Sequence, residues 1–418
     1  MKKISIILFF LFLVLKTFSS SILIPMDDSQ KNHLKAYGIA YWTLERGVDV
    51  KWLLNYRGGS FMIDYVKELE SECLIRGVSF EVIADAKANL IVDEISSPSQ
   101  NMDVVPMQKA PKIAVYSPPN KQPWDDAVTM VLTYAEIPYD VIYDEEIING
   151  KLSDYDWLHL HHEDFTGQFG KFYRNYQHMP WYQEDVRTNT VLAQKLGYLK
   201  VSEMKLAVGK TIKSYVANGG FLFAMCAATD TYDIALSAEG TDICEAMYDG
   251  DGADKHMNDH LDFTKTFAFQ NFKVVEDPFQ YEFSNIDVTD TRKIQMGNDY
   301  FTLFDFSAKW DPVPTMLCQN HTQIVRGFMG QTTAYNKDLL KPEVLVMGEN
   351  KAGNEARYIH GEYGNGTWTF YGGHDPEDYR HAVGDPQTDL NNYPNSPGYR
   401  LILNNVLFPA AKKKKQKT

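Results

Sequence analysis

From about residue 112 onward, short apolar runs alternate with stretches of helical periodicity. Residues 113–116 and 221–225 are wholly apolar, which is typical of strands buried on both faces of a parallel sheet. Further strands are predicted at residues 139–143 and 156–162. Helices are predicted at residues 124–135 and in a stretch that ends at Asn218-Gly219-Gly220, because glycine stops a helix. Strands alternating with helices predict an α/β domain with a parallel sheet covered by helices on both faces.

The same domain continues into a region of β character. Residues 260–350 are predicted to form a β-rich insertion, and a strand is predicted at residues 344–347. A hairpin is predicted from two alternating runs, residues 356–363 and 367–371, joined by Gly364-Asn365-Gly366, since Asn-Gly favours tight hairpin turns. With a last helix at residues 399–407, the predicted domain spans residues 110–410.

A smaller N-terminal α/β part precedes this domain, at residues 22–100. Its strands are predicted at residues 22–24, 48–55, 60–63 and 78–83, with one helix at residues 32–46 and another before the last strand. The polar, proline-containing residues 97–101 are predicted to be a linker.

The N-terminus has the pattern of a secretory signal peptide. Met1-Lys2-Lys3 is basic, residues 4–15 are apolar, and Ser19-Ser20-Ser21 is small and polar. The apolar run falls short of the roughly 20 residues that cross a bilayer, although an uncleaved anchor is the alternative. We therefore expect residues 1–21 to be a leader and the mature chain to be exported, periplasmic or secreted, with no stable membrane span.

Composition narrows the classes of partner. The 418 residues are 44% hydrophobic with a formal net charge of -14, which predicts a folded protein and argues against nucleic acid as a partner. The basic tail, residues 411–418 with four consecutive lysines, is interpreted as a solvated terminus. There are four cysteines and no Cys-x-x-Cys, so disulfides are not the framework of the fold.

Two segments carry candidate nucleophilic chemistry. Cys226 follows the apolar strand 221–225 and is followed by small residues and a predicted helix. A nucleophile on such a turn is exposed beside backbone N–H groups, although a buried structural cysteine is the alternative. His374 follows two glycines and precedes Asp375 and Glu377, so it is a candidate base oriented by an acid.

The Cys226 turn, the late Gly-x-Gly hairpin and the Gly-His-x-Pro-Glu stretch together resemble the class I glutamine amidotransferase-like superfamily, in particular its exported ThuA-like branch. The resemblance covers about residues 110–410 and implies a flavodoxin-like fold. It also implies a Cys-His-Glu triad that maps to Cys226, His374 and a nearby acid. This chain departs from the pattern at Met225 and Ala227, where glycines are usual, and at Pro376, where the acid is usual.

Residues 24–38 also look like exported bacterial proteins commonly labelled asparagine synthetase B. That activity is not expected here. The enzyme needs a catalytic cysteine exposed after removal of Met1, where this chain has Lys2, and a Ser-Gly-Gly-x-Asp-Ser loop that this chain lacks.

Histidines and acids form further candidate groups. His161, His162 and Glu163 end a predicted strand, and the aromatic loop after them contains Arg174. These four residues are predicted to contact a small-molecule, peptide or carbohydrate substrate. His256 and His260 have the spacing that shares a helix face. With His162 and Glu163 they form a candidate site for a divalent metal such as zinc.

Three hypotheses remain open from the sequence. The first is a hydrolase or acyl-transfer enzyme that acts on an amide-like bond through Cys226 and His374, with Glu377 or Asp375 orienting the histidine. The second is a metal-dependent hydrolase, and the third is a non-catalytic carbohydrate- or peptide-binding module on the same fold.

Overall fold

The computed structural model describes residues 20–411, except 119–125, 293, 295–297, 312–313, 318–321, 381 and 383–384. The predicted leader lies outside the described residues apart from Ser20 and Ser21, which begin strand β1, and residues 412–418 of the predicted tail also lie outside. Within the described part of the chain, no helix combines the length and apolarity needed to cross a bilayer.

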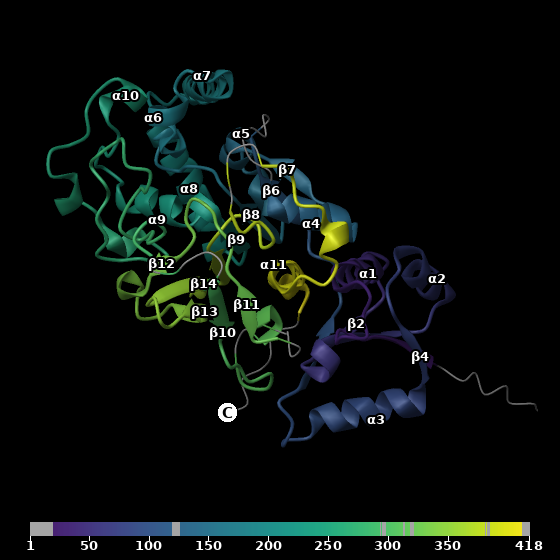
Figure 1. The fold of residues 1–418 in the computed structure, drawn as a ribbon. Helices are drawn as coiled ribbons and strands as arrows, with labels where there is room; N and C mark the ends of the chain where they lie inside the picture. Colours follow the sequence, from purple (N-terminus) through teal and green to yellow (C-terminus); the bar gives the residue numbers. More distant parts are fainter. Residues whose placement is uncertain are drawn as a thin grey trace, which may run out of the picture.

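The first sheet is antiparallel throughout. Its strand order is β4 (Glu81–Ala84), β1 (Ser20–Ile24), β3 (Ser60–Asp64), β2 (Val50–Leu54) and β5 (Asp103–Met107). Helices α1 (His33–Glu45) and α2 (Lys67–Arg76) lie on one side of it, and α3 (Asp85–Ser96) lies on the other (Figure 1). The predicted linker, residues 97–101, connects α3 to β5 and thus lies between two elements of this sheet's own layers.

The second sheet is mixed rather than parallel. One half consists of parallel strands in the order β7 (Asp140–Ile142), β6 (Ile113–Tyr116), β8 (Trp157–Leu160), β9 (Phe221–Met225) and β15 (Gly366–Tyr371). The other half is antiparallel: β14 (Glu355–Tyr363), β13 (Leu345–Asn350), β10 (Tyr300–Leu303) and β11 (Ile324–Arg326), with β12 (Tyr335–Asn336) beside β14. The predicted hairpin is confirmed as β14 and β15, and the chain is a mixed α/β protein.

Alternate residues of the parallel strands enter two different hydrophobic clusters. Val115 and Phe223 share one with α1, α4 (Ala127–Ala135) and α11 (Pro397–Leu407). Ala114 and Leu222 share the other with α8 (Val201–Ala217) and α9 (Asp230–Ser237). This alternation is what a pleated strand with an apolar residue at every position produces.

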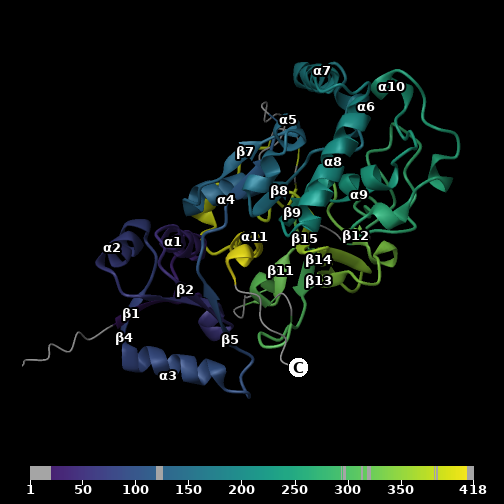
Figure 2. The ribbon, with the colours of Figure 1, turned by 180° about the vertical axis from the view of Figure 1, so that it is seen from behind.

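The connections hold less strand than predicted. The stretch after β8 contains two helices, α6 (Tyr173–Tyr176) and α7 (Pro180–Lys195), where the sequence predicted a long loop. In the described part of residues 260–350, the strands are the short β10, β11 and β12 and the six-residue β13. Helices α6 and α7 lie near α10 (Ala246–Asp249), away from the first sheet (Figures 1 and 2), whereas residues 306–309 form hydrogen bonds with residues 95–101.

Candidate functional site

Three parallel strands end at one edge of the second sheet and bring the predicted residues together. His161 follows β8, Cys226 follows β9, and His374 follows β15. The N–H of Ala228 donates to the carbonyl of His161 at 3.0 Å, and the N–H of Cys226 donates to the carbonyl of Gly373 at 3.1 Å. Carboxyl ends of neighbouring parallel strands meet at the same edge, which is why residues so distant in sequence converge.

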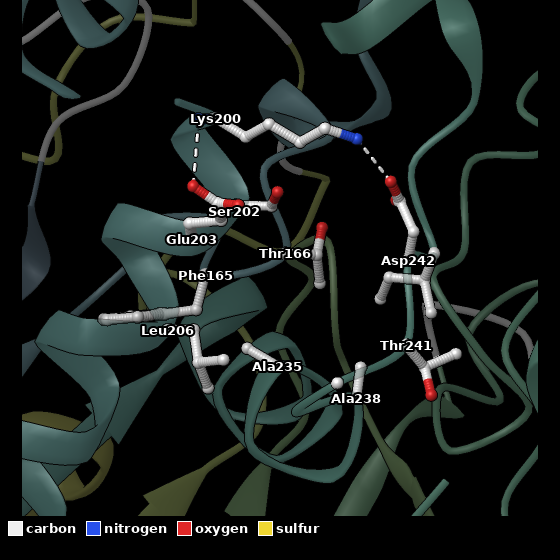
Figure 3. A pocket seen from close by; sticks show the side chains of 12 residues that line it. Phe165, Thr166, Lys200, Ser202, Glu203, Leu206, Ala235, Ala238, Thr241 and Asp242 are labelled. Atoms are coloured by element: carbon white, nitrogen blue, oxygen red, sulfur yellow. Dashed lines mark hydrogen bonds and ion pairs between the residues drawn. The ribbon is translucent and has the colours of Figure 1, made fainter. Parts of the chain in front are cut away.

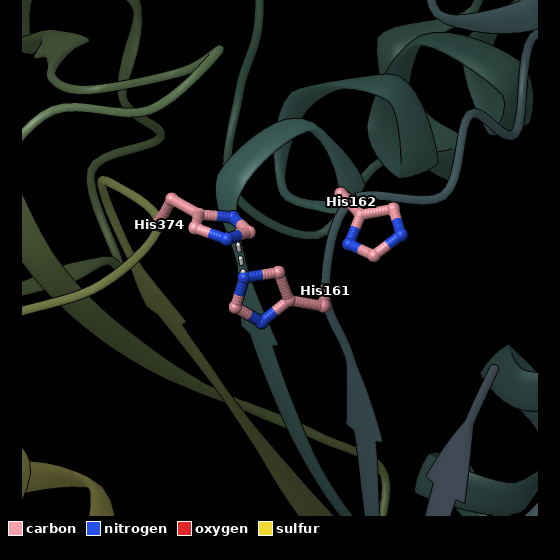
Figure 4. A group of neighbouring side chains, drawn as sticks. All are labelled: His161, His162 and His374. Atoms are coloured by element: carbon pink, nitrogen blue, oxygen red, sulfur yellow. Dashed lines mark hydrogen bonds between the residues drawn. The ribbon is translucent and has the colours of Figure 1, made fainter. Parts of the chain in front are cut away.

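The histidines form a continuous hydrogen-bonded chain. His374 Nδ1 lies 2.8 Å from His161 Nε2, and His161 Nδ1 lies 3.2 Å from His159 Nε2. Figure 4 shows the first of these contacts, with the His161 and His374 rings nearly perpendicular to each other. His159 Nδ1 lies 3.1 Å from the carbonyl of Phe223.

One ring hydrogen follows directly from these contacts. The carbonyl of Phe223 only accepts, so His159 Nδ1 carries a hydrogen. The hydrogens between the three rings depend on their tautomers and on Asp126, whose carboxylate faces both His159 Nε2 and His161 Nδ1.

Asp126 closes the inner end of the chain, and sequence analysis missed it. Its Oδ1 lies 3.3 Å from His159 Nε2 and 3.4 Å from His161 Nδ1, and the same atom accepts the N–H groups of Val128 and Thr129 at the start of α4. Burial acts to raise the pKa of Asp126, but positive charge on His159 and His161 outweighs it and holds that pKa well below its usual value. In the sequence, Asp126 has only the pattern of a helix N-cap, which does not indicate that it also contacts His159 and His161.

Three of the histidines are grouped as metal ligands would be. One ring nitrogen from each of His161, His162 and His374 lies within 4.8 Å of the others. Neither His256 nor His260, which were predicted to share a helix face, belongs to a potential metal-binding group among the described residues. Both are exposed around a short 3-10 helix (Met257–Asp259), and His256 has a left-handed φ of 60°. With no α-helix there, the spacing of four residues does not align them.

Cys226 occupies a strained, closed position. Its φ is +50°, a conformation that costs a non-glycine residue energy and that recurs at nucleophile turns. The residue is only 1% exposed, and its Sγ accepts the N–H of Gln331 at 3.3 Å. Burial raises the pKa of the thiol to about 12, against the opposing effect of the Gln331, Ala227 and Thr332 amides.

The predicted orienting acids are bound to other partners. Asp375 accepts the hydroxyl of Tyr399 in α11 at 2.7 Å, and Glu377 accepts the hydroxyl of Tyr379. The group on His374 Nδ1 is His161. The predicted substrate residue Arg174 is exposed and donates to the carbonyl of Phe279 at 3.2 Å.

A pocket opens beside His162, between the end of β8 and helices α7 and α8. Its acidic lining includes Glu163, Asp164 and Asp185, and its aromatic lining includes Phe172 and Trp181. Burial raises the pKa of Glu163 to about 8 and that of Asp185 to about 6. Glu163 also accepts the N–H of His161 at 3.0 Å, which fixes it next to the histidine chain.

A second pocket lies between α8 and α9. The Lys200 ammonium pairs with Asp242 at its edge, and Leu206, Ala235 and Ala238 form its apolar floor (Figure 3). None of the residues that the sequence predicted for the site lines it, so we place the candidate site at the histidines.

Comparison with known proteins gives distant likenesses. No family model matches the chain, and no curated protein matches it. "Cytoplasmic Protein STM3548 from Salmonella typhimurium" is 12% identical with a TM-score of 0.34, over 72% of this chain and 100% of that one. The GH42 β-galactosidase Gan42B is 12% identical with a TM-score of 0.28, over 65% of this chain and 29% of that one. Likenesses this distant carry no argument about fold or function.

Proposed function

We propose that the protein is a metal-dependent hydrolase in which His161, His162 and His374 hold a divalent cation such as zinc. The observation that carries the proposal is the grouping of these three imidazoles within 4.8 Å, with Asp126 behind His161. Imidazole nitrogen is a preferred zinc ligand, and a carboxylate behind a ligating histidine is the usual second partner. The ligand set keeps His162 of the sequence prediction, replaces His256 and His260 with His161 and His374, and leaves out the predicted ligand Glu163.

The protein residues divide the work in a hydrolytic step. Asp126 and His159 fix His161 with its Nε2 facing His374. His161, His162 and His374 would hold the zinc ion, which would supply Lewis-acid activation of a water or a substrate carbonyl. Glu163, adjacent in sequence to His162 and lining the pocket, is the residue that would exchange a proton with the substrate, as a base above its pKa of about 8 and as an acid below it.

Metal titration tests this proposal. Chelator-treated protein should bind about one zinc ion per chain by calorimetry, and His374→Ala should weaken that binding at least tenfold. His178→Ala is the matched control because His178 is an exposed histidine. Wild type that takes up no metal, or a His374→Ala variant that binds like His178→Ala, would contradict the proposal.

A second candidate is a thiol hydrolase or amidotransferase-like enzyme that uses Cys226 and His374. It is favoured by the left-handed Cys226 turn and the amides around its sulfur. Hydrolysis of p-nitrophenyl esters separates the two candidates. Cys226→Ala abolishes a thiol-dependent activity and leaves a metal-dependent one intact, whereas a chelator does the opposite.

The finer fold class is also a proposal. The parallel strands follow the order β7-β6-β8-β9-β15, which in chain order is the 2-1-3-4-5 of flavodoxin-like sheets. This order, with the site at the carboxyl ends of the strands, supports a flavodoxin-like, class I glutamine amidotransferase-like core. A three-dimensional structure determined by experiment with a different strand order would refute it.

Export through the predicted leader is proposed on the N-terminal sequence pattern alone. N-terminal sequencing of protein from the periplasmic or secreted fraction tests it. A chain that still begins at Met1 and stays with the cytoplasmic fraction would contradict it.

A further inference from the structure

Asp126, His159 and His161 form a second group with the spacing of metal ligands, here called the inner group, behind the outer group of His161, His162 and His374. His159 Nε2 lies 3.2 Å from His161 Nδ1, and Asp126 Oδ1 lies 3.3 Å from the first nitrogen and 3.4 Å from the second. The ligands of tetrahedral zinc lie about 2.0–2.1 Å from the ion, and therefore about 3.3 Å from one another. All three edges of the inner triangle match that spacing.

The atoms that face one another in the inner group need a positive charge between them. The carbonyl of Phe223 takes the hydrogen of His159 Nδ1 at 3.1 Å, so a neutral His159 ring presents an unprotonated Nε2 to the Asp126 carboxylate. Two buried acceptors at 3.3 Å repel each other unless a proton or a metal ion lies between them. A second ring proton satisfies one pair of atoms, whereas a metal ion binds all three atoms of the triangle at once.

The surroundings fix each ligand atom in the way that metal ligands are fixed. The hydrogen bond to the Phe223 carbonyl orients His159 with Nε2 toward the triangle, and ligating histidines commonly donate their other ring N–H to a backbone carbonyl. The N–H groups of Val128 and Thr129 hold Asp126 at 2.7 and 3.1 Å, and ligating carboxylates are held by hydrogen bonds as well. Both histidines of the inner group are fully buried, and the Asp126 side chain is 10% exposed.

We propose that Asp126, His159 and His161 bind a divalent cation such as zinc, as a second ion besides the one of the proposed function. The two ions would share His161, with Nδ1 toward the inner ion and Nε2 toward the outer one. When both nitrogens ligate, the imidazole has released its last ring hydrogen to solvent as a proton. The inner residues do not line the pocket beside His162, so the inner ion would be structural and would join the end of β8 to the start of α4.

The inner site is tested in a protein that lacks the outer one. His162→Ala combined with His374→Ala removes two of the three outer ligands and leaves the inner triangle intact. The full-length double variant, first treated with a chelator, is dialysed to equilibrium against zinc, because a buried site fills only when the structure around it opens locally. Elemental analysis should find about one zinc ion per chain, with nitrogen and oxygen ligands at about 2.0–2.2 Å by X-ray absorption. A double variant that takes up no zinc overturns the inference.

A matched pair of substitutions in the double variant locates the ion. Asp126→Asn removes the ligating charge but keeps an equally good N-cap, and it should weaken zinc binding at least tenfold. Asp262→Asn makes the same change at the N-cap of a short 3-10 helix, where the aspartate side chain is 42% exposed, and it should leave zinc binding unchanged. Equal binding in the two overturns the inference.

His159→Gln in the same double variant replaces Asp126→Asn if the latter does not fold, and the same loss of zinc is expected. If neither folds, zinc uptake by the double variant decides alone. Because two outer ligands are absent throughout, failure of the metal site in the proposed function leaves this outcome unaffected. The slow filling of a buried site also separates the inner ion from the outer one, which a faster calorimetric titration of wild type reports.

Discussion

At the scale of single residues, Cys226 is held as a neutral thiol. The segment around Gln331 covers it, and burial raises the thiol pKa to about 12. Because the thiolate is the reactive form, iodoacetamide at pH 8 should alkylate Cys226 at least roughly 10³-fold more slowly in the folded protein than in urea. Peptide mass spectrometry measures both rates at the same residue. Rapid labelling of folded protein would show instead that the segment opens, and would strengthen the thiol mechanism.

His360 in β14 gives a prediction about pH. It is 3% exposed, it contacts the hydroxyl of Thr369 at 2.9 Å through Nδ1, and burial lowers its pKa to about 3. The unfolded chain binds a proton at this residue below about pH 6.5 while the folded chain does not, so stability is lost as pH falls from 6.5 towards 3. At pH 5 the loss from this residue is about 2 kcal/mol.

Substitution of His360 isolates its contribution to the pH dependence of stability. His360→Gln should flatten the dependence of the unfolding free energy between pH 7 and pH 5 by close to one proton, measured by urea unfolding at several pH values. His178→Gln, at an exposed histidine, should leave the dependence as in wild type. Identical slopes in the two variants would show that His360 titrates normally in the fold.

The site residues differ in how far the sequence could reveal them. Four of them follow strands that the sequence predicts: His161, His162, His374 and Cys226. Because the carboxyl ends of neighbouring parallel strands meet at one edge of a sheet, the sequence predicts that these residues lie close together. The roles of Asp126 and His159 depend on contacts that form only in the folded structure. In the sequence, Asp126 has the pattern of a helix N-cap, and His159 is a single position within a strand that is otherwise apolar. The acids Asp375 and Glu377 show the converse, since their spacing after His374 suggested a triad and their partners are tyrosines.

At the scale of elements, the loop after β8 stores backbone strain beside the pocket. Phe169, Gly170 and Lys171 all have positive φ, at 50°, 68° and 55°. The Gln331 side chain donates to the carbonyl of Gly170 at 2.8 Å, so this loop is joined to the segment that covers Cys226. Non-glycine residues in that conformation cost about 1–2 kcal/mol each, and such strain concentrates at functional sites.

Gly170→Ala tests whether this loop shapes the pocket. A Cβ at residue 170 would lie 2.5 Å from the Phe172 ring, whereas a Cβ at Gly197, which has a φ of +88°, would meet nothing within 4 Å. Gly197→Ala should therefore cost about 1 kcal/mol from backbone strain alone, and Gly170→Ala roughly 1–3 kcal/mol more. Urea unfolding measures both. Equal losses of stability would mean that Phe172 moves aside freely.

Elements with unbroken apolar runs were predictable, and those that depend on their surroundings were not. Strands β6 and β9 and the β14–β15 hairpin follow directly from residue pattern and turn chemistry. Helix α3 and strand β5 were missed, because α3 is half polar and β5 contains Pro106, which an edge strand tolerates. The His256–His260 helix failed because residue spacing implies a shared face only where a helix forms.

At the scale of the whole molecule, the two sheets share one core. A single hydrophobic cluster contains Trp52 of the first sheet, Phe223 of the second, and residues of α1, α4 and α11 between them. Arg400 in α11 is fully buried and donates to the carbonyls of Met26 and Gly58 at 3.3 and 2.7 Å. The sequence predicted a boundary near residue 100, because a polar stretch that contains proline is typical of a linker. Its composition does not reveal how the elements on either side pack.

This shared core predicts that the chain unfolds as one unit. Arg400→Met removes the buried guanidinium that donates to the carbonyls of Met26 and Gly58, beside the first sheet, which should cost about 2–4 kcal/mol. In hydrogen exchange monitored by mass spectrometry, peptides from β1–β3 and from β8–β9 should lose protection by the same amount, because a cooperative unit opens globally. Arg187→Met, at an exposed arginine, is the control and should change neither. Loss of protection confined to the first sheet would instead mean that this sheet unfolds on its own and that α11 does not couple it to the second sheet.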